Sequence, residues 1–134
     1  AGDAMFDEIG AKLGAEFDQL YISLVDTHTA GFYAGMKDLI DAAPTDVKIG
    51  ALTNAAKAYA EAVLKANGVR SRFTCVHGAD DVPLPKPAPH GILQCLEEMG
   101  VSPDEAVYIG DSPSDGMAAL AAGCASVAVT WGAN

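Results

Sequence analysis

The chain has 134 residues, half of them hydrophobic and 19% charged, which is long and apolar enough for one folded domain with a core. Its formal net charge of −10 argues against nucleic acid and anionic membranes as partners, because both favour a basic surface. No apolar run approaches the length that inserts into a bilayer, and the first residues lack the basic flank and apolar stretch of a signal peptide.

The amino-terminal part of the chain is expected to be mainly helical. From Ala4 to Val25, apolar residues recur at helical spacing and charged residues fill the other face, which predicts one long amphipathic helix. Thr27 to Gly35 has no periodicity and is expected to be a linker. A short helix over Met36 to Ala43 must end before Pro44, because the residue before a proline disfavours helical geometry.

The remainder of the chain alternates strands with helices. The predicted strands are short apolar runs over Val47–Thr53, Phe73–His77, Ala106–Gly110 and Ala125–Trp131. The predicted helices, each followed by a glycine, cover Ala55–Asn67, His90–Met99 and Ser112–Ala122. Asn54 is expected to cap the first of these helices. Continuous apolar runs predict a parallel sheet with helices on both faces, and therefore an α/β fold.

We expect the cysteines and histidines to have structural rather than catalytic roles. Cys75, Cys95 and Cys124 are widely spaced in apolar stretches, as expected of small buried side chains in a reducing compartment, either the cytoplasm or an organelle stroma or matrix. A zinc site would need clustered ligands, and the chain has no Cys-x-x-Cys. No catalytic role is assigned to the histidines, which are His28, His77 and His90.

The stretch from Val107 to Asp115 reads Val-Tyr-Ile-Gly-Asp-Ser-Pro-Ser-Asp and carries the clearest chemical signal. Gly110 lets the backbone turn out of the strand, so that Asp111 projects from the strand end and Asp115 lies on the first turn of the next helix. Carboxylate oxygens with waters or phosphate oxygens hold hard cations such as Mg²⁺. Taken alone, the same residues could be a helix cap and a solvated loop aspartate.

Two further motifs could share a crevice with these aspartates, because ligands of open parallel sheets bind at the carboxyl ends of the strands. Thr53 ends a predicted strand, and with Asn54 and the following helix start it offers a hydroxyl and backbone N–H groups to an anion. Lys86 lies in the proline-rich loop Asp80–Pro89, which restricts where its ammonium group can go. Such a lysine could neutralise a phosphate and an attacked carboxylate. Each motif alone could be an ordinary helix cap or a surface lysine.

The order and spacing of the three motifs resemble the second, third and fourth motifs of the haloacid dehalogenase (HAD) superfamily, and most closely its phosphoglycolate phosphatases and similar small-molecule phosphatases. Tyr33–Met36 resembles the return from cap to core, Met117–Gly123 the helix of the fourth motif, and Val129–Gly132 the last strand. The resemblance implies a Rossmann-like HAD core over residues 31–134 and a remnant of a helical cap over residues 1–30.

The resemblance also implies roles for the site residues. Asp111 and Asp115 would hold Mg²⁺, and Lys86 would steady the phosphorylated intermediate. Thr53, Asn54 and Lys86 would bind the substrate, a small phosphorylated metabolite. A haloacid dehalogenase is disfavoured because carbon–halogen chemistry needs no metal site, whereas a phosphohexose mutase stays open.

The first motif of the family, Asp-x-Asp-Gly-Thr, is absent from these 134 residues. That motif supplies the nucleophilic aspartate and the acid/base aspartate. The closest string begins at Asp26, but it lacks the second Asp and the Gly and lies where the cap should rejoin the core. The missing strand would lie between the strands that end at Thr53 and Gly110, whose backbone groups need partners. Upstream residues or another chain could complete the sheet, or the sheet could close differently.

Two functions therefore stay open. In the first, the chain is the carboxyl-terminal portion of an Mg²⁺-dependent phosphatase that acts through an aspartyl-phosphate on an aspartate outside this sequence. In the second, the chain is a catalytically inactive HAD-like binding or scaffold subunit of a larger assembly. The acidic surface and the exposed cap helix would suit that second role.

Overall fold

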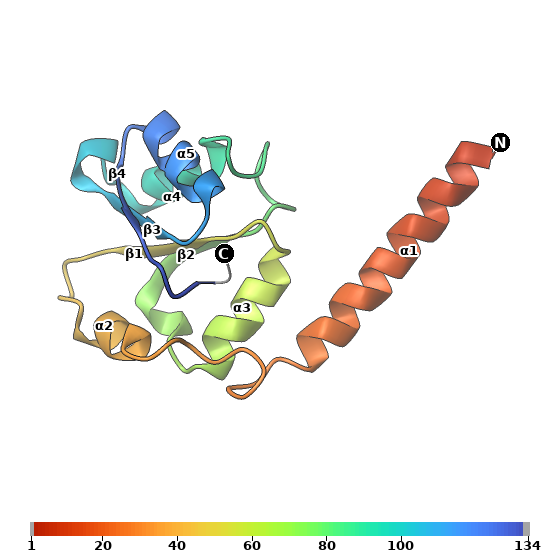
Figure 1. The fold of residues 1–134 in the computed structure, drawn as a ribbon, viewed down its shortest axis with the longest axis horizontal. Coiled ribbons are helices and arrows are strands. Elements are labelled where there is room, and N and C mark those ends of the chain that lie inside the picture. The colour runs from red at the N-terminus through yellow and green to blue at the C-terminus, as the bar shows by residue number, and fades with distance from the viewer. Residues whose placement is uncertain (1, 133–134) are drawn as a thin grey trace.

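The computed structural model describes residues 2–132, with the side chains of the first helix described from Glu8 onward (Figure 1). The helices are α1 (Gly2–Ser23), α2 (Met36–Ala42), α3 (Lys57–Ala66), α4 (His90–Met99) and α5 (Pro113–Ala122). The strands are β1 (Ile49–Leu52), β2 (Phe73–His77), β3 (Val107–Gly110) and β4 (Ala125–Ala128). Short 3-10 turns cover Arg70–Arg72 and Pro103–Glu105. Each predicted helix and strand is present, and β2 and α4 have the predicted bounds.

The strands form two separate parallel pairs. β1 pairs with β2, with Leu52 opposite His77, and β3 pairs with β4, with Gly110 opposite Ala128. Within residues 2–132 no ladder joins β1 to β3, so the gap expected from the missing family strand stays open. The sheet has therefore not closed in another order.

Helices cover both sides of the strands, as the sequence predicts. α4 contacts β1 and β2, α5 contacts β3 and β4, and the two helices pack against each other, so together they bridge the two strand pairs. α3 packs on β2 from the opposite side, next to α2 (Figure 1). Successive residues of β1 divide between the two layers, because Leu52 packs with the α4/α5 cluster and Ala51 with the cluster around Leu64 and Val76.

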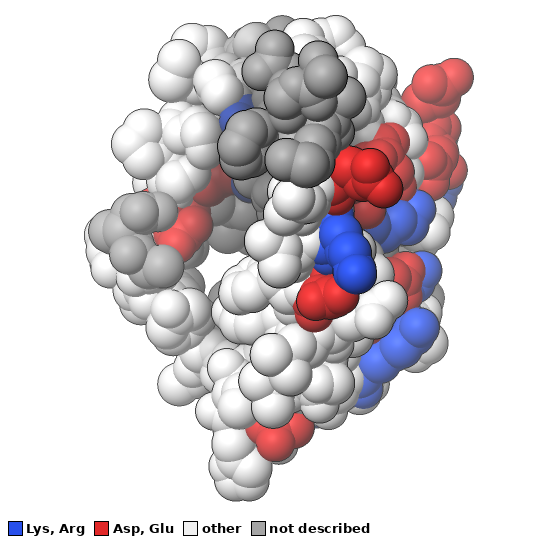
Figure 2. All heavy atoms as spheres, turned by 90° about the vertical axis from the view of Figure 1, so that its right-hand side faces the viewer, with Lys and Arg blue, Asp and Glu red and all other residues white. Residues whose placement is uncertain are grey.

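α1 extends away from the rest of the chain (Figure 1). The periodicity correctly predicts the helix, but its apolar side chains are exposed, including Ile9, Leu13 and Phe17. The carboxyl-terminal end of α1 contacts the rest of the chain through the ring of Tyr21. The centre of this ring lies 4.9 Å from that of the Tyr59 ring on α3. Figure 2 shows the molecule from the side on which α1 lies in Figure 1. Lys and Arg side chains alternate there with Asp and Glu side chains. None of the described helices is long and apolar enough to cross a bilayer.

The predicted cap of α3 is wrong. The helix begins at Lys57, and Asn54 makes no capping hydrogen bond to it. The Asn54 side chain instead binds the backbone of Lys86, to which its Nδ2 donates at 2.9 Å and from which its Oδ1 accepts at 2.9 Å. The Lys57 N–H donates to Asp80 Oδ1 at 2.7 Å, so the proline-rich loop caps this helix.

Candidate active site

The structure joins the predicted motifs at the carboxyl ends of β1 and β3. The amide of Asn54 holds the loop after β1 against the proline-rich loop through the backbone of Lys86. Lys86 Nζ in turn donates to Asp115 Oδ1 at 2.6 Å, which connects that loop to the start of α5. The segments after β1 and β3 therefore meet through one lysine, as the strand-end argument predicts.

Asp115 is a buried carboxylate, with 5% of its surface exposed. Its Oδ1 accepts from Lys86 and Tyr108, and its Oδ2 accepts from the backbone N–H and the hydroxyl of Ser112 at 3.0 and 2.7 Å. The backbone N–H of Asp111 also donates to Oδ2, at 3.2 Å. Burial opposes ionisation, but the hydrogen bonds from Lys86 and Ser112 outweigh it and lower the pKa of Asp115 to about 2. Asp115 is therefore an anion at neutral pH.

Lys86 is not an ordinary surface lysine, because only 11% of its side chain is exposed. Its Nζ lies 3.2 Å from the hydroxyl of Tyr108 and 5.7 Å from the centre of that ring. The ammonium group thus lies between a carboxylate and an aromatic ring at the end of β3, where its hydration is reduced. An ammonium group held in this way interacts strongly with any anion that reaches it.

Tyr108 is a site residue that the sequence argument missed, because β3 was interpreted only as a buried strand. Its hydroxyl donates to Asp115 Oδ1 at 3.2 Å. Burial raises the pKa of Tyr108 well above its ordinary value, so the hydroxyl stays neutral and remains a donor. The alternation of strand side chains gave the available signal, since Tyr108 lies two residues before Gly110 on the face toward α4 and α5.

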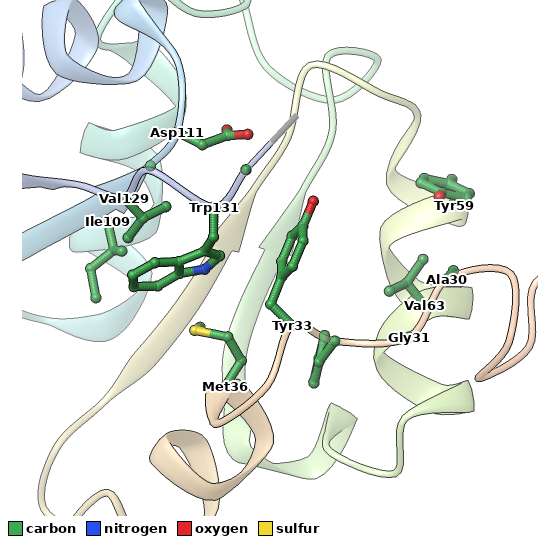
Figure 3. A pocket seen from close by; sticks show the side chains of 13 residues that line it. Ala30, Gly31, Tyr33, Met36, Tyr59, Val63, Ile109, Asp111, Val129 and Trp131 are labelled. Carbon is green, nitrogen blue, oxygen red and sulfur yellow. The ribbon is translucent and has the colours of Figure 1, made fainter. Parts of the chain in front are cut away.

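Asp111 lies at the edge of a pocket of about 420 Å³. The pocket is lined by α3, the linker before α2, the end of β3 and the segment after β4. Figure 3 shows the rings of Tyr33 and Trp131 among the side chains that line it, with Asp111 above Trp131 in this view. The Asp111 side chain lies against the backbone of Gly132, where an added Cβ would come within 2.1 Å of Oδ2. Asp111 is thus the carboxylate of the pair that lines this opening.

Thr53 lies next to this site, and its hydroxyl already helps to form the turn after β1. Its Oγ1 accepts from the backbone N–H of Ala55 at 3.0 Å. A hydroxyl both accepts and donates, so the Thr53 hydroxyl can also donate a hydrogen bond to an anion. The expected contribution of the α3 start to an anion site is weaker than predicted, because the Lys57 N–H binds Asp80.

The rejected substitute for the first motif has a local structural role. Asp26 Oδ1 accepts from the backbone N–H groups of His28 and Thr29 at 2.7 and 2.8 Å, and it thereby holds the turn that follows α1. These backbone hydrogen bonds lower the pKa of Asp26. Both Asp26 and His28 are exposed. Nothing in their contacts connects them to Lys86 or Asp115.

Of the two carboxylates of the fourth motif, Asp111 lines the pocket and has the oxygen donors that a hard divalent cation prefers, whereas both oxygens of Asp115 already accept hydrogen bonds. Asp111 and Asp115 are directly linked through the Asp111 N–H, and Asp115 is ionised at neutral pH. Carboxylate oxygens are among the donors that Mg²⁺ prefers.

Residues 2–129 match the family model described as haloacid dehalogenase-like hydrolase. The chain belongs to this family. It is 33% identical over 118 residues to the phosphoglycolate phosphatase of Pectobacterium atrosepticum, which covers 88% of this chain and 50% of that protein. The chain thus spans about half the length of this curated relative, and the HAD-like relationship inferred from its motifs is confirmed.

Solved structures confirm the fold of this HAD-like chain. A HAD-superfamily hydrolase of subfamily IA from Geobacter sulfurreducens matches with a TM-score of 0.67 and 36% identity, over 71% of this chain and 45% of that one. CbbY from Rhodobacter sphaeroides, solved in complex with xylulose-(1,5)-bisphosphate, matches with a TM-score of 0.64 and 29% identity, over 69% of this chain and 43% of that one. The α/β, Rossmann-like HAD core predicted from the sequence is therefore correct.

Proposed function

We propose that this chain supplies the carboxyl-terminal part of the active site of an Mg²⁺-dependent phosphatase that acts on a small phosphate monoester of the phosphoglycolate kind. The observation that carries the proposal is the buried Lys86–Asp115 pair, with Nζ and Oδ1 2.6 Å apart, held by Asn54 at the carboxyl ends of two strands. The similarity to phosphoglycolate phosphatases supports the same reaction class.

Each residue then has a defined part in the reaction. Asp111 and Asp115 would hold Mg²⁺, which would neutralise charge on the phosphoryl oxygens. Lys86 would bind the phosphoryl group and stabilise the negative charge that develops on it, and the Thr53 hydroxyl and Asn54 would orient it. Tyr108 and Asp115 would position the Lys86 ammonium group, since both contact its Nζ.

The nucleophile would be an aspartate outside these 134 residues. Its carboxylate would attack phosphorus and release the alcohol, and water would then cleave the aspartyl-phosphate to give inorganic phosphate and the free carboxylate. Such an aspartate would come from a strand in the gap between β1 and β3, which lies between Thr53 and Asp111. We further propose that residues 31–134 form the core and residues 1–30 belong to the cap.

The composition of the chain bears on both the ligand and the cellular compartment. The acidic composition favours a small phosphorylated metabolite as ligand over nucleic acid or an anionic membrane. Three free cysteines favour a reducing compartment, with the cytoplasm as the first choice.

Two matched pairs of substitutions test the proposal in the complete gene product. With p-nitrophenyl phosphate, Lys86→Met should lower kcat by about 10²-fold or more, whereas Lys65→Met, on the exposed face of α3, should leave it unchanged. Asp111→Asn should raise the Mg²⁺ concentration needed for half-maximal rate, and Asp104→Asn should not. Equal rates for Lys86→Met and Lys65→Met would refute the assignment of Lys86.

If the complete gene product binds Mg²⁺ but never turns over a phosphate ester, the second function gains support. The chain would then be a HAD-like binding or scaffold subunit, for which the exposed apolar side chains of α1 provide a surface.

A further inference from the structure

A second cluster of metal-ligating side chains lies between β2 and α4, apart from the proposed phosphate site. Cys75 and His77 are two residues apart on β2 and therefore point to the same face, where Cys95 of α4 meets them. The three residues are 3%, 3% and 6% exposed. One ligand atom from each lies within 4.8 Å of the other two. The three residues come from a strand and a helix, so a search of the sequence for Cys-x-x-Cys does not detect that they cluster.

The contacts of His77 place two carboxylates beside the cluster. Its Nδ1 lies 2.9 Å from Asp81 Oδ2, and its Nε2 lies 2.9 Å from Glu98 Oε1. In a metal site built here, Nε2 and Glu98 would bind the cation from the same side, and Nδ1–H would donate to Asp81.

We propose that Cys75, His77 and Cys95 bind a thiophilic divalent cation such as Zn²⁺, with Glu98 as fourth ligand and Asp81 orienting the imidazole. Thiolate and imidazole are the ligands that Zn²⁺ prefers, and structural zinc sites have four protein ligands. A carboxylate behind the ligating histidine is a recurrent feature of such sites. The hard oxygen donors of Asp111 and Asp115 would favour Mg²⁺ instead, so the two sites differ in metal as well as in place.

The balance of charge and the geometry both allow this site. Binding would release one proton from each thiol, so two thiolates neutralise the dication in a buried position before Glu98 is counted. Tetrahedral coordination at a Zn–S distance of about 2.3 Å implies ligand atoms about 3.8 Å apart. The present separations, all within 4.8 Å, need to shrink by about 1 Å or less. Glu98, whose side chain is 45% exposed, lies between the buried cluster and solvent and offers a route for entry.

The site would fasten β2 to α4, and so it extends beyond the proposed phosphatase reaction. A ligand that binds the folded chain and not the unfolded chain raises the free energy of unfolding. We therefore expect Zn²⁺ to raise the melting temperature of the reduced, metal-free protein, and a chelator to reverse the increase.

Cobalt titration of the reduced, metal-free protein tests the proposal directly. We expect one equivalent of Co²⁺ to bind with a thiolate-to-cobalt charge-transfer band, and Zn²⁺ to displace it. Cys75→Ser and Cys95→Ser should each lower the affinity at least tenfold and weaken the band. Cys124→Ser is the matched control, because Cys124 lies outside the cluster, and it should bind as the parent does. Asp111→Asn should give the same thiolate band at the same Co²⁺ concentration, because it affects only the proposed Mg²⁺ site.

A measurement on the unsubstituted protein covers the case in which a serine variant does not fold. Alkylation followed by peptide mapping should show that Zn²⁺ slows the modification of Cys75 and Cys95 at least tenfold and leaves Cys124 unchanged. Failure to bind Co²⁺, binding without the thiolate band, or equal protection of all three cysteines would overturn the proposal. A Cys75–Cys95 disulfide in freshly isolated protein would overturn it as well, since both thiols would be consumed.

Discussion

At the scale of single residues, Asp115 connects α5, β3 and the proline-rich loop through one carboxylate. Oδ1 binds Lys86 and Tyr108, while Oδ2 binds Ser112 at the start of α5. This arrangement depends on the absence of a side chain at Gly110, where an added Cβ would lie 2.4 Å from the Cβ and Cγ atoms of Asp115. The glycine that ends β3 therefore does more than turn the chain, because it makes room for the carboxylate.

We predict that Gly110→Ala destabilises the protein by about 1–3 kcal/mol, because the new methyl group must displace Asp115. Gly116→Ala is the matched control inside α5, since nothing lies within 4 Å of its added Cβ. That substitution should be neutral or stabilise by up to about 1 kcal/mol, because alanine favours a helix over glycine. Urea unfolding of both variants measures the difference. Similar midpoints for the two would show that Asp115 can move freely.

A second prediction concerns pH and the ion pair between Glu61 and Arg70, whose Oε2 and Nε atoms are 2.7 Å apart. The hydrogen bond from Arg70 lowers the pKa of Glu61, so the pair stabilises the fold above about pH 4.5 and loses its effect as the pH falls below that value. Glu61→Gln should cost roughly 0.5–1 kcal/mol at pH 7 and almost nothing at pH 3, because the pair is partly exposed.

The control for this pH prediction is Glu97→Gln, which changes an exposed carboxylate on α4. Its effect on unfolding free energy should be small at both pH values. A loss for Glu61→Gln that is equally large at pH 3 and pH 7 would mean that the side chain stabilises the fold by packing rather than by charge.

The sequence was informative about which site residues meet and uninformative about how they bind one another. Thr53 and Asp111 were predicted to share one crevice because the carboxyl ends of parallel strands share an edge. The interaction of Asn54 with the backbone of Lys86 depends on the approach of two loops 32 residues apart, which no local pattern encodes. The same reason explains why Tyr108 and the cluster of Cys75, His77 and Cys95 were missed.

At the scale of elements, periodicity and the position of glycines predicted the helices and their ends, whereas the sequence did not predict where the strands begin and end. Gly100 and Gly123 adopt positive φ angles of 61° and 80° and end α4 and α5 as predicted. β1 begins two residues later than predicted, at Ile49, because the Val47 N–H donates to Pro44 in a turn. β4 stops at Ala128, although the Val129 N–H still donates to Gly110 at 2.9 Å. Turns that continue an apolar run cannot be told from strand by composition alone.

We predict that α1 is the first element to be cut in limited proteolysis of this chain. Its apolar side chains are exposed, and the ring of Tyr21 contacts that of Tyr59 on α3 in a tilted arrangement. Elements with few buried contacts open locally at low cost. Mass spectrometry should place the early chymotrypsin cuts between Phe17 and Leu24, while the rest of the chain keeps its melting temperature. Early cuts within α4 or α5 would contradict this.

At the scale of the whole molecule, two strand pairs are held together by a shared layer of helices. α4 covers β1 and β2, α5 covers β3 and β4, and Lys86 connects the two halves at the strand ends. The gap between β1 and β3 was predictable from the missing first motif, because that motif belongs to the strand between them. The sequence could not tell whether the sheet closes over the gap, and the structure leaves it open within residues 2–132.

The central claim is that Thr53, Lys86, Asp111 and Asp115 form half of a phosphatase site and that the other half is an Asp-x-Asp segment. The most direct test measures Mg²⁺-dependent release of phosphate from phosphoglycolate and p-nitrophenyl phosphate by the 134-residue chain, before and after an upstream segment with that motif is joined to it. We predict no turnover by the chain alone, and turnover after completion for which Asp111→Asn raises the Mg²⁺ concentration that is needed. Turnover by the chain alone, or a folded and completed protein without turnover, would contradict the account.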